Sequence, residues 1–599
     1  MTQFYKEGKS EDKKICTLCQ HYCNISVGKT GICGVNKNTG DKIECLVYGY
    51  PAVINADPVE KKPLYHFLPQ TKTLSLGTVG CNFKCSFCQN HGISQEQTID
   101  KSKYYSPEDI VKMAFAKGCD SISYTYNEPT IFYPYIKDIA TLAKANGLKN
   151  VFVSNGFESD EVLNDMAGLI DAANIDYKSN DAKYYKKELG GNLEKLQRNL
   201  KRFKELGIWI EITTLIIPNL NDSDEELEAI AKFMFEELGE ETPWHLSAFH
   251  PDYKMLDRGR TPKETLERAK KIGDKLGLKY VYMGNAGLDN TTKCRKCDEV
   301  VLNRVTYQTR VDNRKFGVLC PKCDTKLDGV FHTRRDTNFA GSFYSNNCGE
   351  IKKQFQHFNT ILQNSDFKMP THINPKAIIV PHAGYEYSGF TANVAYNVVK
   401  NKKPRRVIVI GPSHKFGFEG ASVTLHDKYQ TPCGDIRIDT RYVHHLKNKF
   451  DSVNFYDGVH CEHSTETQAL FVKAYFPYSL MIEIVYGKME SSELAKVVEY
   501  ILKDPANFLI ISTDLSHFYT QDKAKQLDSL CLEAINKLDL NIWNKGCEAC
   551  GRVGVKALIE TANKHNWKSQ VLDYRTSFDV TKDDSRVVGY TCAIVGTSV

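Results

Sequence analysis

Short apolar runs alternate with longer amphipathic segments over much of the chain, and this alternation predicts an α/β fold. In a first stretch, residues 71–290, the expected strands are 73–78, 121–127, 151–155, 174–178, 209–217, 244–249 and 279–285. Helical patterns lie between them, at 107–117, 131–146 and 222–237, and the segments 106–109 and 221–224 are typical helix starts. Repeated strand–helix units with right-handed crossovers predict a parallel sheet, either a partial (β/α) TIM-type barrel or a doubly wound sheet.

A second stretch, residues 331–599, shows the same kind of pattern. Its expected buried strands are 377–383, 406–412, 480–486 and 508–513, and its expected helices include 527–538 and 554–563. Two cysteine-rich segments flank the first stretch. The sequence therefore predicts four parts: a cysteine-rich module at 1–70, an α/β domain at 71–290, a small module at 291–330 and a second α/β domain at 331–599.

Composition narrows the class of protein. The 599 residues are 41% hydrophobic and 25% charged, which is ordinary for a globular protein, and a net charge of +5 gives no reason to expect nucleic acid. No apolar run of about 18 residues occurs and the first residues are polar, so we expect no contact with membranes. Many of the 20 cysteines lie in C-x2-C or C-x3-C pairs, which indicates metal ligation in a reducing cytosol and a cytoplasmic location.

The most informative motif is Cys81, Cys85 and Cys88, spaced C-x3-C-x2-C directly after the first expected strand. Three thiolates on one short loop suit a [4Fe–4S] cluster and leave one of its four irons without a protein ligand. That iron is then open to a substrate or cofactor. The alternatives are a chance cluster or a zinc loop, but zinc requires four ligands and no fourth lies close by.

With Phe87 beside its last cysteine, this loop resembles the motif of the radical S-adenosylmethionine (radical SAM) superfamily. The resemblance implies that the open iron binds SAM and that one electron cleaves it to methionine and a 5′-deoxyadenosyl radical. It also implies an electron donor such as ferredoxin or flavodoxin. The strand ends that follow are similar to those of glycyl-radical activating enzymes, and they imply cofactor-binding roles for Glu128 (or the backbone near it), Asn155, Asp176, Lys178 and His250.

More closely, residues 12–330 resemble the radical SAM member of the AmmeMemoRadiSam group. The run 57–67 (DPVEKKPLYHF) and the N-terminal cysteine module carry this resemblance. A third component of that group, an AMMECR1-like protein, is not part of this chain and is an expected partner.

Two further sets of cysteines have the spacing of metal ligands. Cys16, Cys19, Cys23 and Cys33 suit either zinc or a second iron–sulfur cluster, because thiolates bind both, and zinc is the preferred interpretation. The two C-x2-C pairs of Cys294, Cys297, Cys320 and Cys323 predict a zinc ribbon.

In the last domain, histidines follow the ends of apolar strands, where side chains project into a common crevice. This domain resembles Memo, which is similar in fold to class III extradiol dioxygenases with non-heme iron. The resemblance implies metal ligation by His382, His414 and Cys550, with Asp514 and His517 beside the metal and a contribution from His463. A thiolate in place of a carboxylate departs from the dioxygenase pattern, so iron, zinc and copper stay open.

The predicted function is a radical SAM reaction coupled to a second reaction at the metal of the Memo-like domain, because fusion favours linked steps. The alternatives are an activase that makes a glycyl radical on a partner protein, and a Memo-like half that binds peptides without catalysis. The substrate cannot be read from the sequence; a small molecule and an RNA modification both stay open.

Overall fold

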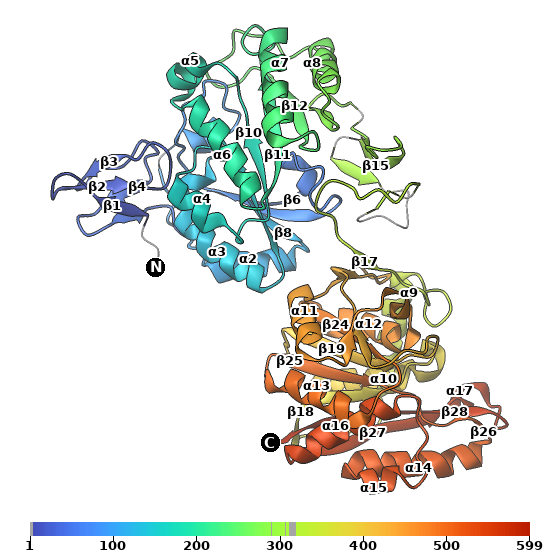
Figure 1. Ribbon diagram of the computed structural model, residues 1–599. Helices are drawn as coiled ribbons and strands as arrows, with labels where there is room; N and C mark the ends of the chain where they lie inside the picture. The colour runs from blue at the N-terminus through green and yellow to red at the C-terminus, as the bar shows by residue number, and fades with distance from the viewer. Residues whose placement is uncertain (1–3, 97, 289, 306, 311–318, 321) are drawn as a thin grey trace. The chain divides into compact units, whose positions relative to one another are not determined.

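The chain forms two compact units, Met1–Phe331 and His332–Val599, which are coloured blue to green and yellow to red in Figure 1. This computed structural model describes residues 4–96, 98–288, 290–305, 307–310, 319–320 and 322–599. Both units combine helices with a central sheet, so the predicted α/β class is confirmed. The finer division of the first unit at residues 70 and 290 stays a prediction.

An eight-stranded sheet forms the centre of the first unit. In order across the sheet, its strands are β13 (Val281–Gly284), β12 (Trp244–Ala248), β11 (Trp209–Ile216), β10 (Ala172–Asp176), β9 (Lys149–Ser154), β8 (Ser121–Tyr124), β7 (Lys72–Gly77) and β6 (Val53–Pro58). Strands β7 to β13 are parallel and follow chain order, whereas β6 is antiparallel to β7. The strands thus follow the order of a (β/α) barrel. The sheet is open, because within the described residues no hydrogen-bonded pairing joins β6 to β13.

Helices connect these parallel strands. They are α1 (His91–Ser94), α2 (Pro107–Ala116), α3 (Tyr133–Ala145), α4 (Asp160–Met166), α5 (Ala182–Tyr184), α6 (Leu193–Glu205), α7 (Asp224–Phe233) and α8 (Lys263–Lys275). Their first turns are capped as the sequence predicts: Ser106 and Asp109 form a capping box at α2, and Ser223 caps α7. Each strand predicted in this stretch is present, with its ends shifted by a few residues.

The segment after β6 links the two ends of the sheet. The backbone N–H groups of Tyr65 and His66 donate to Glu211 in β11, each at 2.8 Å. The ring of His66 is also bonded to the hydroxyl of Tyr282 in β13 at 2.6 Å. The motif at 57–67 therefore crosses from the first strand of the open sheet to the last ones.

Two small cysteine-rich sheets belong to the same unit. The N-terminal one comprises β1 (Tyr5–Glu7), β2 (Lys13–Cys16) and β3 (Asn24–Ser26), next to the hairpin of β4 (Asn36–Asn38) and β5 (Ile43–Cys45). It lies beside α4 in Figure 1, where the N–H of Ser159 donates to the carbonyl of Leu18. The other sheet comprises β14 (Thr292–Lys293), β15 (Val300–Val305) and β16 (Gln308–Arg310).

The second unit is built on a mixed sheet. Its order is β23 (Val453–Asn454), β20 (Ala421–Val423), β24 (Leu480–Tyr486), β19 (Arg406–Pro412), β25 (Asn507–Ser512), β18 (Ile373–Val380), β28 (Val587–Ser598) and β26 (His517–Tyr519), with β27 (Lys568–Thr576) paired to β28. The neighbours β24, β19, β25 and β18 are parallel, so their carboxyl ends meet at one edge. These four central strands are the ones that the sequence predicts.

Helices surround this second sheet, with α10 against α12 and α13 against α16. They are α9 (Cys348–Gln363), α10 (Tyr385–Val399), α11 (Thr440–Lys449), α12 (His463–Tyr475), α13 (Ser491–Lys503), α14 (Gln521–Lys537), α15 (Leu540–Trp543), α16 (Arg552–Lys564) and α17 (Phe578–Thr581). A small sheet of β17 (Arg334–Arg335), β21 (Lys428–Tyr429) and β22 (Ile436–Arg437) adjoins it. Across the described ranges, none of the helices has the length and apolar character needed to span a membrane.

Four cysteines of the second unit form two disulfides, Cys348–Cys433 and Cys531–Cys547. The interpretation of the cysteine content as metal ligation was therefore incomplete. Disulfides are uncommon in reducing compartments, so these two bonds are not what a cytosolic location predicts.

Candidate active sites in the two units

A cavity of about 520 Å³ opens at the carboxyl ends of the parallel strands in the first unit, a size typical of small-molecule sites. Cys81, Cys85 and Cys88 line one side of it, on the loop 78–90 after β7, called the cysteine loop below. Residues at or just after the ends of β8, β9, β10 and β12 line another part of it, among them Tyr126, Asn127, Glu128, Ser154, Asn155, Asp176, Lys178 and Ser247. The cysteine loop and the strand ends thus face one space.

Asn127 holds the start of the cysteine loop. Its amide Nδ2 donates to the carbonyl of Gly80 at 2.8 Å, and its Oδ1 accepts from the N–H of Thr78 at 3.2 Å. At the other end of the loop, the sulfur of Cys88 lies 3.1 Å from Oγ of Ser94. The three thiols are thereby presented to the cavity by backbone that the neighbouring strand end fixes in place.

Glu128 lines this cavity, but its carboxylate accepts hydrogen bonds from neighbouring residues of the protein. It is 2% exposed, and its carboxylate accepts from the N–H groups of Thr130 (3.0 Å) and Asn155 (2.8 Å) and from Oγ of Ser154 (2.9 Å). Burial raises the pKa of Glu128 against these hydrogen bonds. Burial and then the charge of Glu128 raise the pKa of the neighbouring Glu158 to about 8, so Glu158 is the protonated member at neutral pH.

Lys178 places a positive charge beside the cysteine loop. Its Nζ is 2.7 Å from the carboxylate of Asp176 and 5.7 Å from the centre of the Phe87 ring. Although burial lowers it, the pKa of Lys178 is held above its ordinary value by Asp176. Burial raises the pKa of Cys85 to about 11, and the charge of Lys178 opposes that rise, which favours a thiolate.

In the second unit, a group called the histidine centre here is made of His382, His414, His463 and Cys550. One ligand atom each of His382, His414 and Cys550 lies within 4.8 Å of the others, and Nε2 of His382 is 3.2 Å from Sγ of Cys550. The ring of His463 is centred 4.5 Å from that of His414 and 5.3 Å from that of His382. Two imidazoles and a thiolate in this arrangement fit a divalent metal ion.

Hydrogen bonds from behind orient these rings. Nδ1 of His382 is 3.0 Å from Oγ of Ser512. Glu462, which is fully buried, lies 3.2 Å from Nδ1 of His414 and 2.8 Å from Nδ1 of His463. Burial acts to raise the pKa of Glu462, but the two histidines hold it below its ordinary value. Bonding at Nδ1 leaves Nε2 of each ring for a metal, as is usual for ligating histidines.

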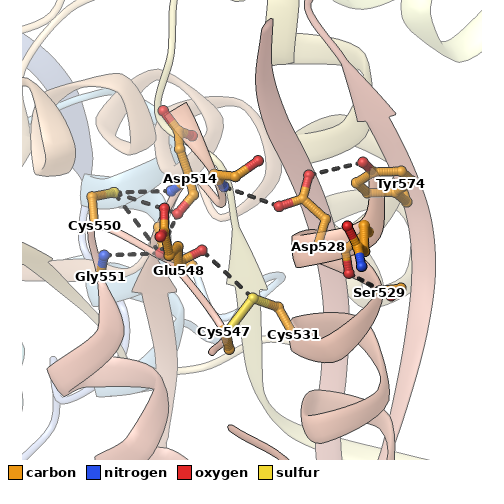
Figure 2. The surroundings of a disulfide bond; sticks show 12 residues. Asp514, Asp528, Ser529, Cys531, Cys547, Glu548, Cys550, Gly551 and Tyr574 are labelled. Carbon is orange, nitrogen blue, oxygen red and sulfur yellow. Dashed lines mark hydrogen bonds between the residues drawn. A yellow bond between two sulfur atoms is a disulfide. The ribbon is translucent and has the colours of Figure 1, made fainter. Parts of the chain in front are cut away.

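Cys550 is held by Asp514 and by a disulfide-braced loop (Figure 2). The N–H of Asp514 donates to Sγ of Cys550 at 3.1 Å, and Oδ1 of Asp514 accepts from the N–H of His382 at 2.8 Å. Figure 2 shows the disulfide Cys531–Cys547 next to the loop that leads to Cys550. This bond ties that loop to α14.

A third group of ligands consists of four cysteines outside the strands of the small sheet β14–β16. The sulfurs of Cys294, Cys297, Cys320 and Cys323 all lie within 4.8 Å of one another, with 3.6 Å for both Cys294–Cys323 and Cys297–Cys320. Tetrahedral zinc with bonds of 2.3 Å separates its sulfurs by about 3.8 Å. The geometry of these four thiols therefore fits one zinc ion.

Comparisons with known proteins found a matching family model for each of the two units. The family model for the radical SAM superfamily matches residues 75–234, and that for Memo-like proteins matches residues 335–594. The Methanocaldococcus jannaschii protein MJ0808, an uncharacterised protein, is 41% identical over 333 residues, 55% of this chain and 98% of its own. A MEMO1 family protein of Sulfurisphaera tokodaii is 31% identical over 271 residues, 42% of this chain and 95% of its own.

The chain belongs to the radical SAM superfamily and to the Memo family. It is a radical SAM enzyme fused to a Memo-like domain. Among solved structures, a domain of a pyruvate-formate lyase-activating enzyme from Bacteroides vulgatus is 16% identical with a TM-score of 0.25, covering 28% of this chain and 99% of its own.

Most residues predicted for the radical SAM site come together in the cavity, namely Cys81, Cys85, Cys88, Glu128, Asn155, Asp176 and Lys178. Because its carboxylate is occupied, Glu128 fits a role in positioning Asn155, and the backbone near it faces the cavity. His250 is not among the described residues that line the cavity: its side chain is 50% exposed and bonded to Gln89 at 3.0 Å.

In the Memo domain, the predicted ligands His382, His414 and Cys550 converge, with Asp514 against both His382 and Cys550. His517 lies in β26, near enough to Asp514 to influence its pKa, but belongs to none of the ligand groups found among the described residues. Sequence reasoning missed His245, which lines the radical SAM cavity, and Glu211, to which His245 is bonded at 2.7 Å. It also missed the role of Glu462, although the adjacent His463 was a signal.

Proposed function

We propose that this enzyme couples a radical SAM reaction in its first unit to a second reaction at a metal in its Memo domain. The observation that supports the proposal most directly is the convergence of His382, His414 and Cys550 in a chain that also has the radical SAM cavity. Joining two sites in one chain raises the effective concentration of one product at the other site. The substrate class stays open between a small molecule and an RNA.

The first site fits its cofactors by its donor set, three thiols that face a cavity large enough for SAM. When bound there, a [4Fe–4S] cluster with one open iron supplies the electron that cleaves SAM. Asn127 holds the cysteine loop, and Lys178 stabilises the thiolates. Residues 125–127 line the cavity, and we propose that their backbone accepts from the SAM amine, in line with the alternative to Glu128.

The second site fits a divalent metal held by His382, His414 and Cys550. We favour non-heme iron, since two imidazoles suit it and the Memo fold resembles that of extradiol dioxygenases; zinc and copper are the other candidates. Glu462 fixes the ring orientation of His414, and His463 shares the same carboxylate, so it is placed to hold or move a proton beside the metal.

The proposal has further elements. We propose zinc at Cys294, Cys297, Cys320 and Cys323, with the 3.6 Å sulfur separations in support. The proposal also includes a ferredoxin or flavodoxin as electron donor, an AMMECR1-like partner and a cytoplasmic location. The alternative functions, a glycyl-radical activase and a peptide-binding Memo half, stay predictions.

The coupling is tested with full-length variants. Wild type, His382→Ala and Cys85→Ala are reconstituted anaerobically and given SAM, dithionite, and the small-molecule and RNA fractions of an extract of the source cells. We expect His382→Ala to form 5′-deoxyadenosine and to accumulate a species that wild type does not. Added Cys85→Ala protein, whose Memo domain is intact, should then consume that species. Identical product profiles for wild type and His382→Ala would contradict the coupling.

A further inference from the structure

The N-terminal cysteine site, made of Cys16, Cys19, Cys23 and Cys33, surrounds a small enclosed space in the first unit. Cys16 and Cys33 are buried, and Cys19 and Cys23 line the same space. The remaining lining includes His21, Asn36 and Asn82. Four converging thiols in a space closed to solvent indicate a metal site.

The separation of the sulfurs distinguishes this site from the ribbon. The four sulfurs of Cys294, Cys297, Cys320 and Cys323 lie within 4.8 Å of one another, as one tetrahedral ion requires. No three sulfurs of the N-terminal cysteine site, all of whose residues are described, form such a group. The same is true of Cys81, Cys85 and Cys88. The N-terminal site therefore shares with the cysteine loop a wider spacing of its thiols than the ribbon has.

Asn82 supplies a second, independent observation. It is 2% exposed, its Oδ1 accepts from Nδ2 of Asn155 at 2.7 Å, and its own Nδ2 has no hydrogen-bond partner among the described residues. Asn82 lines the N-terminal cysteine site but not the SAM cavity. A buried amide N–H without a partner is costly, and a sulfur atom of a bound cluster would satisfy it.

The two cysteine segments are also packed backbone against backbone. Gly80 has a φ of +88°, and a Cβ built there would lie 2.6 Å from the carbonyl oxygen of Cys33. Nε2 of His21 lies 3.0 Å from the carbonyl oxygen of Asn82. The N-terminal cysteine site is thus built directly onto the loop that carries Cys81.

We propose that Cys16, Cys19, Cys23 and Cys33 bind a second iron–sulfur cluster of the [4Fe–4S] class, and that Asn82 donates a hydrogen bond to it. This departs from the zinc preferred from the sequence. Four thiolates leave no open iron, so the second cluster is an electron carrier and not a second SAM site. The inference does not depend on the proposed coupling to the Memo domain.

The test is the metal content of full-length protein reconstituted anaerobically with iron and sulfide. Cluster iron is counted by the acid-labile sulfide that accompanies it, so that an iron in the Memo domain is not included. We expect about eight cluster irons per chain in wild type, and about four in the triple variant Cys81→Ala, Cys85→Ala, Cys88→Ala, which should still give the EPR signal of a reduced cluster. The double variant Cys19→Ala, Cys23→Ala should also retain about four irons. Cys45→Ala is the matched control, because Cys45 is a half-buried cysteine near Cys16 and Cys33 but is not part of the cavity lining; it should retain all of the iron.

A triple variant that holds no cluster iron or sulfide, but a zinc ion that is lost when Cys19→Ala and Cys23→Ala are added, would overturn the proposal. If a variant does not fold, Mössbauer spectra of wild type decide: two clusters per chain support the proposal, and one cluster with two zinc ions overturns it. Asn82→Leu in the triple variant should shift the EPR spectrum of the remaining cluster. An unchanged spectrum would remove Asn82 from the proposal.

Discussion

The sulfur of Cys550 lies 3.2 Å from Nε2 of His382, although 168 residues separate them in the chain. His382 follows β18, and Cys550 precedes α16. Asp514, at the end of the neighbouring β25, bonds to both of them. The fold of the Memo domain therefore brings together His382, Cys550 and their common partner Asp514 from three segments that are distant in the chain.

Glu462 is expected to control how tightly the Memo metal is held. Glu462→Gln keeps the size of the side chain but removes the charge that orients His414 and His463. Loss of such a partner of a ligating histidine typically lowers metal affinity by about 10–100-fold. Competition with a chelator, measured on iron- or zinc-loaded protein, checks this. Glu493→Gln, an exposed change in α13, is the control, and equal affinity for both variants would contradict the assignment.

The disulfide Cys531–Cys547 is expected to support the loop that carries Cys550. It closes a loop of 16 residues, for which cross-linking contributes about 3 kcal/mol to stability. Cys531→Ser should weaken metal binding several-fold, whereas Cys348→Ser, which breaks the other disulfide of the unit, should leave it unchanged. Metal retention after dialysis measures the effect. A loss of the same size in both variants would indicate general destabilisation instead.

Glu128 and Glu158 provide a matched pair in the radical SAM site. Glu128→Gln replaces one carboxylate oxygen by N–H₂, which then faces the N–H of either Thr130 or Asn155, so an unpaired donor costs about 1–3 kcal/mol. We expect the KM for SAM to rise about tenfold. Glu158, with a pKa of about 8, is already protonated at pH 7, so Glu158→Gln should change the KM little. The KM is obtained from 5′-deoxyadenosine formation measured against SAM concentration. A larger rise in the KM for Glu158→Gln than for Glu128→Gln would contradict the assignment.

Glu483 predicts a specific dependence of stability on pH. Burial acts to raise its pKa, but Arg335 and His460 lower it from 4.5 to about 2. Because the folded-state pKa lies below the ordinary one, the stabilisation is complete above pH 4.5 and is lost as the pH falls toward 2. The difference in unfolding free energy between wild type and Glu483→Gln should be about 3 kcal/mol at pH 7 and about 1 kcal/mol at pH 3. Urea denaturation at both values measures it; a difference independent of pH would contradict the prediction.

The sequence predicted those parts of the molecule that depend on local pattern. Apolar runs such as 406–412 are buried strands at the predicted places, because a central parallel strand is apolar on both faces. The cysteine loop is also local, since its three thiols lie within eight residues.

What the sequence did not predict depends on partners that are distant in the chain. The pairing of Cys348 with Cys433 spans 85 residues, and neither lies in a cysteine motif. The sequence places Asn82 between two cysteines but does not show that it lines the N-terminal cysteine site or that its Nδ2 has no hydrogen-bond partner among the described residues. The bond of His245 to Glu211 depends on the register of β12 beside β11. Such contacts follow from tertiary packing and leave no periodic pattern.

The central claim is that the cysteine loop alone performs the cleavage of SAM. The most direct measurement is 5′-deoxyadenosine formed by reconstituted full-length Cys85→Ala, with Cys119→Ala, a buried cysteine outside the cavity, as the control. We predict that Cys119→Ala forms 5′-deoxyadenosine like wild type and that Cys85→Ala forms none while retaining the zinc of the ribbon. Undiminished 5′-deoxyadenosine from Cys85→Ala would contradict the account.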